Sequence, residues 1–135
     1  MKNNKGYEVE KAMKKWFHGE SHWSDSVDFQ TKTGLFEVKS CKLKLQCGNG
    51  NYRRPTPQKK AKTTQYGRFV VKLHNHLGIK TISEKENKEP KYIFVIVIEN
   101  QKAWKVVSWA DVDKLISREK ESNMIRIQDV FKGVL

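Results

Sequence analysis

The segments SDSVDF at residues 24–29 and LFEVKS at residues 35–40 decide the fold that this sequence predicts. Both contain the apolar and β-branched residues that strands favour, and the turn-forming residues 32–34 lie between them. We therefore expect a β-hairpin whose strands cover residues 27–30 and 35–40.

Three ionisable side chains interrupt the apolar pattern of this hairpin. Because side chains alternate along a strand, Glu37 and Lys39 should project from one face, while Asp28 comes from the partner strand. Mg²⁺ takes oxygen ligands, which Asp28, Glu37 and the backbone carbonyl of Val38 could supply. Lys39 would then lie beside a metal-bound water and could orient or activate it. A metal ion and a lysine can together activate water and neutralise phosphate charge, so these residue types suit phosphodiester hydrolysis.

An amphipathic helix is predicted before the hairpin, over residues 7–17. Val9, Met13 and Trp16 recur at the spacing that lines one side of a helix. Two acidic residues, Glu8 and Glu10, lie on either side of this apolar stripe, and Glu10 is slightly closer to its centre. The spacing therefore favours Glu10 slightly as a carboxylate near the buried side of the helix.

The rest of the chain predicts further strands and helices around this start. Strands are expected at residues 68–74, 92–98, 103–107 and 124–127. The 92–98 segment is apolar throughout, so it should be central in a sheet. Ser108 and Asp111 indicate a capped helix start. Strands and helices interleaved in this way predict a three-layer α/β sandwich around a mixed sheet.

Three features between these elements also carry predictions. Thr56 and Pro57 indicate the start of a lysine-rich helix that ends near Gly67, and the charged residues 83–90 predict a disordered connector. Beyond Ser40 the apolar residues change from even to odd positions. This change predicts either a bulge near Ser40, or a strand that is buried on both faces in its first half and peripheral in its second.

Composition limits the class of protein. The chain has 135 residues, of which 37% are hydrophobic and 31% charged, so we expect one domain over residues 1–135. The longest apolar run, residues 92–98, is too short to span a membrane, and no secretory signal is visible, so a soluble, intracellular, cytoplasmic protein is expected. Cys41 and Cys47 are too few for a disulfide framework and are expected to pack as thiols. The net charge of +12 indicates a polyanionic partner.

Asp28 followed by Glu37-Val38-Lys39 resembles the pattern of the PD-(D/E)xK nuclease superfamily, although Val27 stands in the place of its proline. The segment KGYEVE at residues 5–10, before the amphipathic helix, is similar to archaeal Holliday-junction resolvases and restriction-type nucleases. Those enzymes place a glutamate of the first helix at the metal, and the resemblance gives that role to Glu10.

The resemblance leaves two ligand assignments open. Glu8 is the alternative to Glu10 in the helix, and Asp25 is the alternative to Asp28 if the first strand begins earlier. The apolar residues on both sides of Asp28 are typical of a strand interior and favour Asp28. The Glu-x-Lys pair could also be no more than an exposed ion pair on a half-solvated sheet.

The resemblance implies a three-layer restriction-endonuclease-like fold, with a central mixed β-sheet flanked by helices and an αβββαβ core. It also implies a Mg²⁺-dependent DNA endonuclease, for which Mn²⁺ should substitute, acting on duplex or branched DNA in the manner of a Holliday-junction resolvase or a restriction enzyme. Cutting two strands is economical for a symmetric homodimer with one active site per strand. Apolar C-terminal residues could serve that interface or, equally, the core: Val130, Phe131, Val134 and Leu135.

Basic residues follow the proposed catalytic strands and are candidates for DNA contact. Lysines neutralise phosphates, while arginine and glutamine can also hydrogen-bond to phosphates or base edges. The candidates are Arg53, Arg54, Gln58, Lys59, Lys60 and Lys62. The same charge would suffice for a non-catalytic, basic nucleic-acid-binding protein, which is the alternative function.

Overall fold

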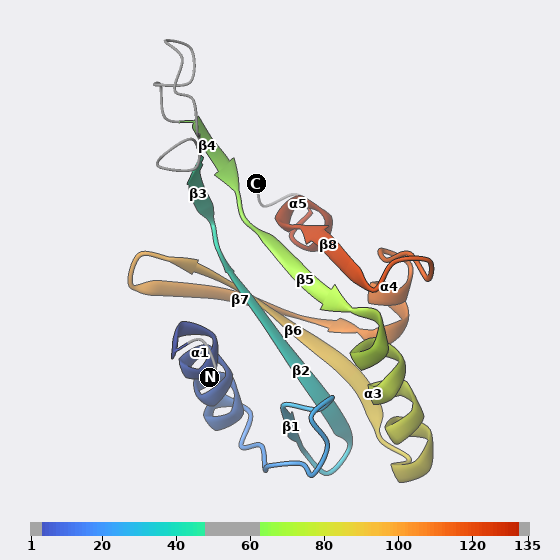
Figure 1. The fold of residues 1–135 in the computed structure, drawn as a ribbon. Helices are drawn as coiled ribbons and strands as arrows, with labels where there is room; N and C mark the ends of the chain where they lie inside the picture. The colour runs from blue at the N-terminus through green and yellow to red at the C-terminus, as the bar shows by residue number, and fades with distance from the viewer. Residues whose placement is uncertain (1–3, 48–62, 133–135) are drawn as a thin grey trace.

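A mixed four-stranded β-sheet lies at the centre of the computed structural model, which describes residues 4–47 and 63–132 (Figure 1). In spatial order its strands are β1 (Phe29–Gln30), β2 (Gly34–Lys42), β6 (Glu89–Ile98) and β7 (Gln101–Ser108). β2 and β6 run parallel, whereas β1 with β2 and β6 with β7 are antiparallel pairs. The fold is therefore mixed α/β around a mixed sheet, and the apolar 92–98 segment belongs to an inner strand, as expected.

The predicted hairpin is confirmed as β1 and β2. β2 stays in register with β6 without interruption, from Gly34 opposite Glu89 to Lys42 opposite Val97, so no bulge occurs near Ser40. Residues 34–37 are buried, and the residues that follow them in β2 are partly or fully exposed. The apolar residues of β2 therefore change from even to odd positions where the strand passes from a part buried on both faces to a peripheral part.

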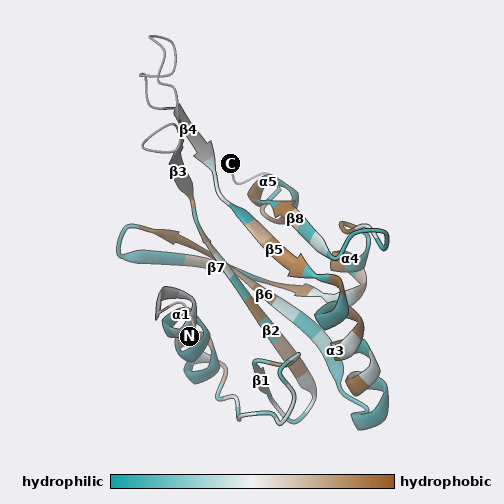
Figure 2. Ribbon diagram, viewed as in Figure 1, coloured by the Kyte–Doolittle hydropathy of each residue, from teal (hydrophilic) through white to brown (hydrophobic). Residues whose placement is uncertain are grey.

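α1 (Asn4–Trp16) covers one face of the sheet, as the amphipathic pattern predicts. Its residues Val9 and Met13 pack against Phe36, Ile93 and Val95. Each of these buried side chains contributes on the order of 1.5–3 kcal/mol by leaving water. In the ribbon coloured by hydropathy, α1 contains many hydrophilic residues, whereas hydrophobic residues run along β5 and much of β2 (Figure 2).

The opposite face of the sheet is covered by a two-stranded ribbon and three helices. These elements are β5 (Arg68–Lys72), α3 (Leu73–Glu86), α4 (Trp109–Asp113), β8 (Ser122–Arg126) and α5 (Ile127–Val130). Phe69 and Val71 from β5 join Phe94 from β6 and Ile125 from β8 in the larger core cluster. The expected strands at 103–107 and 124–127 are present as β7 and β8, and Ser108 caps α4 by accepting a hydrogen bond from the Asp111 backbone N–H (3.2 Å).

The expected connector at residues 83–90 was wrong, and the strand expected at residues 68–74 is two residues shorter. α3 occupies residues 73–86, so the expected strand at 68–74 ends at Lys72, and β6 begins within the expected connector. The buried side of α3 includes His76 and Ser83 as well as Ile79 and Ile82. Because two of these four buried residues are polar, the sequence has no continuous apolar stripe that would predict the helix.

The expected lysine-rich helix does not extend to Gly67. Residues Thr63–Tyr66 form strand β4, which pairs antiparallel with β3 (Lys44–Cys47). Two β-branched threonines begin β4 and suit a strand better than a helix. The described part of the chain therefore has five strands between α1 and α3, where the expected core has three. The rest of the expected helix, residues 56–62, lies outside the described residues.

Two open questions from the sequence are answered by burial. Val130 and Phe131 are buried in the larger core cluster, so they serve packing, while Val134 and Leu135 lie outside the described residues. Cys41 packs against the same cluster, and burial raises the pKa of its thiol to about 12, as suits a packing residue.

In the described part of the chain, no helix is both long enough and apolar enough to cross a lipid bilayer.

Candidate active site

Asp28 lies immediately before β1, at the edge of β2. Its backbone N–H donates to the carbonyl oxygen of Phe36 (2.8 Å), and its Oδ2 accepts a hydrogen bond from the backbone N–H of Val38 (2.6 Å). The N–H and C=O groups of one strand residue point to the same edge of the strand, so the Val38 carbonyl is directed toward the edge where Asp28 lies. The structure therefore brings Asp28 and this carbonyl to one edge of β2.

Glu37 and Lys39 project from the same face of β2 and form an ion pair. Lys39 Nζ lies 3.0 Å from Glu37 Oε1, and the two side chains are only 19% and 9% exposed. Ion pairs on the protein surface are weakened by water and by the mobility of their side chains. The pair of Glu37 and Lys39, by contrast, is largely shielded from water. Glu37 and Lys39 are therefore not the solvated surface pair that the sequence left open.

The second carboxylate oxygen of Glu37 has no hydrogen-bond partner. Oε2 is buried, and among the described residues it is the only buried side-chain nitrogen or oxygen without a partner. Burying an unpaired carboxylate oxygen costs free energy, and native structures rarely leave such atoms unsatisfied without a functional reason. In the described part of the chain, this atom is therefore the strongest indication of a functional position.

The electrostatic surroundings of Glu37 disfavour its charged form. Burial, and after it the charge of Asp28, raises the pKa of Glu37 to about 8. The charge of Glu10 acts in the same direction, and the nearby Lys39 offsets only part of the effect. A divalent cation beside Glu37 would favour the ionised form of its carboxyl group.

The structure distinguishes the alternative acidic residues of the sequence. Glu10 contributes to the raised pKa of Glu37, whereas Glu8 and Asp25 are not among its causes. Glu8 and Asp25 are both exposed, while Glu10 is half-buried on α1. Glu10 and Asp28 are thus the carboxylates that the fold brings toward Glu37.

The three carboxylates do not form a closed ligand cage. Within residues 4–47 and 63–132, no group of three or more His, Cys, Asp or Glu side chains is arranged closely enough to hold a metal ion. Mg²⁺ needs only one or two protein carboxylates, because waters and substrate phosphate complete its coordination. The donors at the edge of β2, with one unpartnered oxygen among them, fit such a partly hydrated ion.

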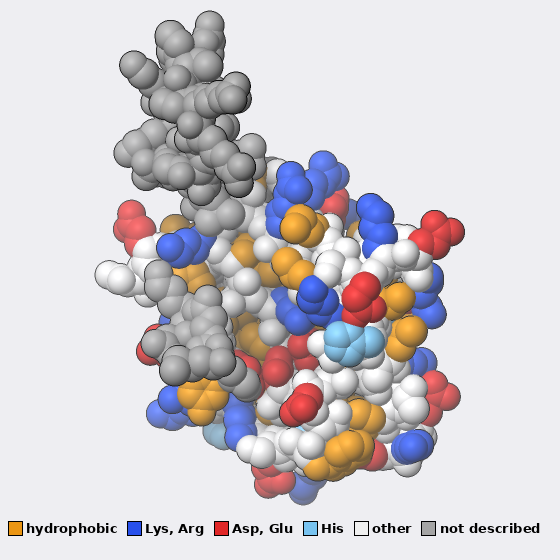
Figure 3. Space-filling model, viewed as in Figure 1, with side chains coloured by type: hydrophobic (Ala, Val, Ile, Leu, Met, Phe, Trp, Pro, Cys, Tyr) orange, Lys and Arg blue, Asp and Glu red, His pale blue; other side chains and the backbone are white. Residues whose placement is uncertain are grey.

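A groove lies beside the second half of β2, and none of the proposed site residues lines it. It is lined by residues 40–43 and 97–102, and by Gly6, Glu8 and Val9 of α1. In the space-filling view, acidic side chains gather over the middle of β2, and Lys and Arg side chains border them (Figure 3). The proposed DNA contacts lie outside the described residues: Arg53, Arg54, Gln58, Lys59, Lys60 and Lys62.

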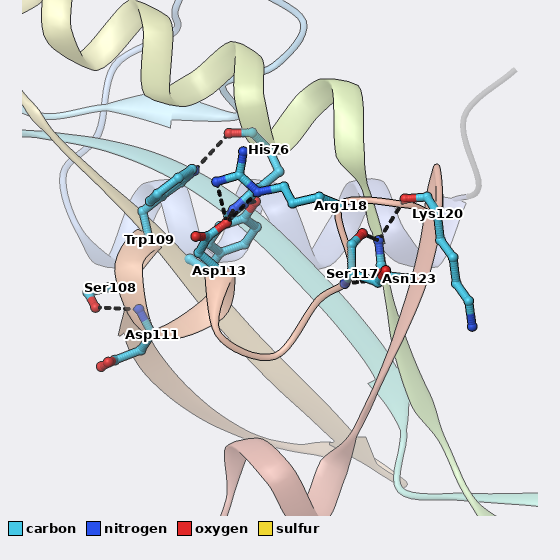
Figure 4. A network of polar contacts seen from close by, with 10 residues as sticks. His76, Ser108, Trp109, Asp111, Asp113, Ser117, Arg118, Lys120 and Asn123 are labelled. Atoms are coloured by element: carbon cyan, nitrogen blue, oxygen red, sulfur yellow. Dashed lines mark hydrogen bonds and ion pairs between the residues drawn. The ribbon is translucent and has the colours of Figure 1, made fainter.

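Sequence reasoning did not find a polar network that begins at Tyr92, beside Glu37 on the sheet, and reaches the surface at Arg118. Tyr92 is the register partner of Glu37 on β6, and its hydroxyl lies 2.7 Å from His76 Nδ1. His76 Nε2 lies 3.0 Å from Asp113 Oδ1, which also accepts hydrogen bonds from Arg118 (Figure 4). These residues are far apart in the sequence, and no spacing pattern connects them.

No protein-family model matches the chain, and no curated protein or solved structure is significantly similar to it. Function therefore has to be inferred from the chemistry of the site itself.

Proposed function

We propose that this protein is a divalent-metal-dependent DNA endonuclease of the PD-(D/E)xK type. The observation that carries the proposal is Glu37 Oε2, a buried carboxylate oxygen without a partner, on a residue whose pKa is raised by burial and by the charges of Asp28 and Glu10. A buried anionic site of this kind favours a hard cation. Mg²⁺ is the proposed cofactor, and Mn²⁺ should replace it.

Each proposed site residue has a role that its position supports. Asp28, Glu37 and the Val38 carbonyl are the proposed metal ligands, and Glu10 assists from α1. The ion, when bound, would polarise the scissile phosphate and lower the pKa of its bound water. Lys39 is held by Glu37 at 3.0 Å, so its ammonium group is positioned to orient that water and to stabilise charge on the phosphate.

The restriction-endonuclease-like fold is part of the same proposal. It is supported by α1 against one face of a mixed sheet, by the Glu-x-Lys strand β2 inside that sheet, and by α3, which leads into the parallel strand β6. The five strands between α1 and α3 would then be an elaboration of the αβββαβ core.

DNA is the proposed substrate because the chain carries a net charge of +12. We expect the basic residues after β3 to contact phosphates, and a homodimer to supply one active site for each strand. A four-way junction and a duplex site are the two substrate classes that this arrangement suits.

A non-catalytic nucleic-acid-binding protein is the second candidate function. The observation that favours it is the absence of a three-ligand metal group in the described residues, together with the large positive charge. In that case Glu37 would be dispensable for every activity of the protein, and its removal would leave DNA affinity unchanged or increase it.

The test is cleavage of labelled linear duplex, four-way junction and single-stranded DNA with Mg²⁺, Mn²⁺ or chelator. Native protein is expected to cut in a metal-dependent manner, and Glu37→Ala to lose cutting at least roughly 100-fold while still binding DNA. Glu84→Ala, which removes an exposed carboxylate of α3, is the matched control. Metal-dependent cutting retained by Glu37→Ala would refute the site, and binding without cutting by native protein would favour the second candidate.

A further inference from the structure

One face of the ribbon formed by β5 and β8 is exposed to solvent. Side chains alternate along both strands, and Phe69, Val71 and Ile125 are buried in the larger core cluster. The residues between them project outward, and every one of them is exposed. The outward face of β5 and β8 consists of Arg68, Val70, Lys72, Ser122, Met124 and Arg126.

Two arginines lie opposite each other at one end of this face. Arg68 and Arg126 are register partners in the antiparallel pair, although like charges in directly opposite positions destabilise a sheet. Asp129 offsets only part of this repulsion, because it pairs with Arg126 (3.1 Å), while Arg68 forms no ion pair with a described residue. A bound polyanion would relieve the remaining repulsion.

The other end of the outward face is also basic. Lys72 Nζ donates to the hydroxyl oxygen of Ser122, which leaves the ammonium charge in place. Glu121, the residue before Ser122, pairs with His74. None of the six outward residues is acidic. In the space-filling view, Lys and Arg side chains lie over β5 and β8, with hydrophobic side chains among them (Figure 3).

An apolar pair lies between the two basic ends. Val70 and Met124 are opposite each other in the register, and they are 40% and 64% exposed. Phosphates bind cations, whereas base edges also offer apolar contacts such as the thymine methyl group. Cations on both sides of an apolar centre therefore suit a nucleic acid whose base edges lie between rows of phosphates.

The shape of the outward face favours duplex DNA over other nucleic acids. The major groove of B-form DNA admits a two-stranded β-ribbon. The corresponding groove of duplex RNA is deep and narrow, and side chains cannot read it. Single strands are typically held by bases stacked on aromatic side chains, and none of the six outward residues is aromatic.

We propose that the outward face of β5 and β8 binds duplex DNA in its major groove. The basic residues at its two ends bind phosphates, and Val70 and Met124 lie against base edges. This inference deepens the proposed function, because it names a surface that holds the DNA. It rests on the proposed function only as far as DNA is the substrate, and it does not depend on the metal site.

The first test is affinity for duplex DNA at low salt in chelator, measured for native protein, Met124→Glu and Met124→Lys. Met124 is neutral and largely exposed, so either change adds charge without disturbing the core. Met124→Glu is expected to weaken binding by at least about fivefold, because it places a carboxylate against a polyanion. Met124→Lys is expected to tighten binding by about twofold or more, a gain that loss of folding cannot produce.

The matched control makes the same charge changes at Ala103, an exposed position on strand β7. Ala103→Glu and Ala103→Lys are expected to stay within about twofold of native affinity. Equal changes at positions 103 and 124 would overturn the inference, because affinity would then follow only the total charge of the protein.

A second test compares ligands and salt dependence. The effects of the Met124 variants are expected on duplex DNA, and equal effects on single-stranded DNA and duplex RNA of the same sequence would overturn the assignment to the major groove. Replacing Arg68 and Lys72 together by alanine should reduce the salt slope on duplex DNA by about two. Replacing Lys32 and Lys85, two exposed lysines outside the ribbon, is the control, and an equal reduction there would contradict the inference.

The outcomes separate this inference from the proposed function. Absence of DNA binding by native protein would refute both. Metal-dependent cutting with an affinity that does not respond to either Met124 variant would refute the inference alone. Binding that responds to these variants, without cutting by native protein, would support the inference and refute the proposed endonuclease.

Discussion

At the scale of single residues, Glu37 is buried although only one of its two carboxylate oxygens has a partner. Lys39 contacts one carboxylate oxygen, and the other oxygen has no partner. Removing a carboxylate from water costs more free energy than one ion pair returns unless further groups compensate. A residue that weakens the fold in this way, within a cluster of other carboxylates, is typical of a functional position.

The raised pKa of Glu37 predicts how stability depends on pH. In the unfolded chain the carboxyl titrates near 4.5, and in the folded protein near 8, so the folded state binds this proton more tightly. The contribution to stability is therefore complete below pH 4.5 and is lost as the pH rises to about 8. Glutamine cannot ionise, so the stability of Glu37→Gln relative to native protein should increase across this pH range, by up to roughly 5 kcal/mol in free energy of unfolding.

Urea unfolding in the presence of chelator, at several pH values between 4 and 9, measures this difference. Glu84→Gln, at an exposed position on α3, is the control and should not reproduce the gain. Parallel pH profiles for native protein and Glu37→Gln would mean that burial does not disfavour the ionised form of Glu37.

At the scale of elements, Gly67 allows the ribbon of β5 and β8 to approach the end of β2. The Gly67 N–H donates to the carbonyl oxygen of Leu43 (3.0 Å). A Cβ atom at position 67 would lie 2.0 Å from the carbonyl oxygen of Lys42, which is backbone and cannot turn away. This close approach keeps β5 and β8 against the face of the sheet from which Glu37 and Tyr92 project.

Substitution of this glycine should therefore separate the two elements. Gly67→Ala is expected to reduce the free energy of unfolding by roughly 1–3 kcal/mol, because β5 must move away from β2. Gly6→Ala is the matched control, since a Cβ there meets nothing within 4 Å and alanine favours the helix. Equal urea midpoints for the two variants would show that the crossing of β2 and β5 tolerates a side chain.

At the scale of the whole molecule, the sheet is covered on both faces and the candidate site opens at an edge. α1 covers one face, and β5, β8, α3, α4 and α5 cover the other. The two-residue strand β1 begins directly after Asp28. β1 pairs with β2 only at Leu35 and Phe36, so the residues of β2 from Val38 onward have no partner residue in β1. The surplus of positive charge would attract a polyanion such as DNA.

Binding of DNA should depend strongly on salt. In chelator, where no cutting is expected, the logarithm of the association constant should fall linearly with the logarithm of salt concentration. Replacing Lys59, Lys60 and Lys62 together by alanine should reduce the slope by about three, because each lysine that contacts a phosphate contributes about one.

A triple variant of exposed lysines elsewhere is the control for this measurement: Lys32, Lys85 and Lys114 replaced by alanine. Its slope should stay within about one unit of the native value. An equal reduction of the salt slope in both triple variants would mean that DNA affinity depends on the total charge of the protein. The segment after β3 would then not be a specific DNA-binding segment.

The sequence by itself determined the elements whose signals are local. The hairpin of β1 and β2, the amphipathic helix α1, the inner strand β6 and the Ser108 cap all follow from residues close together in the chain. Asp28, Glu37 and Lys39 could be singled out for the same reason, because alternation along two neighbouring strands places them together. Their metal-binding role remains a prediction.

Only the tertiary structure decided what depends on residues far apart in the chain. α3 is stable as a helix although its buried side includes His76 and Ser83, because packing and hydrogen bonds compensate for a weak apolar pattern. The burial of Glu37, its unpartnered oxygen and its Tyr92 neighbour arise when β2 pairs with β6 and the second layer covers them. Burial and hydrogen-bond direction are properties of the assembled fold, so no local pattern of residues could have revealed them.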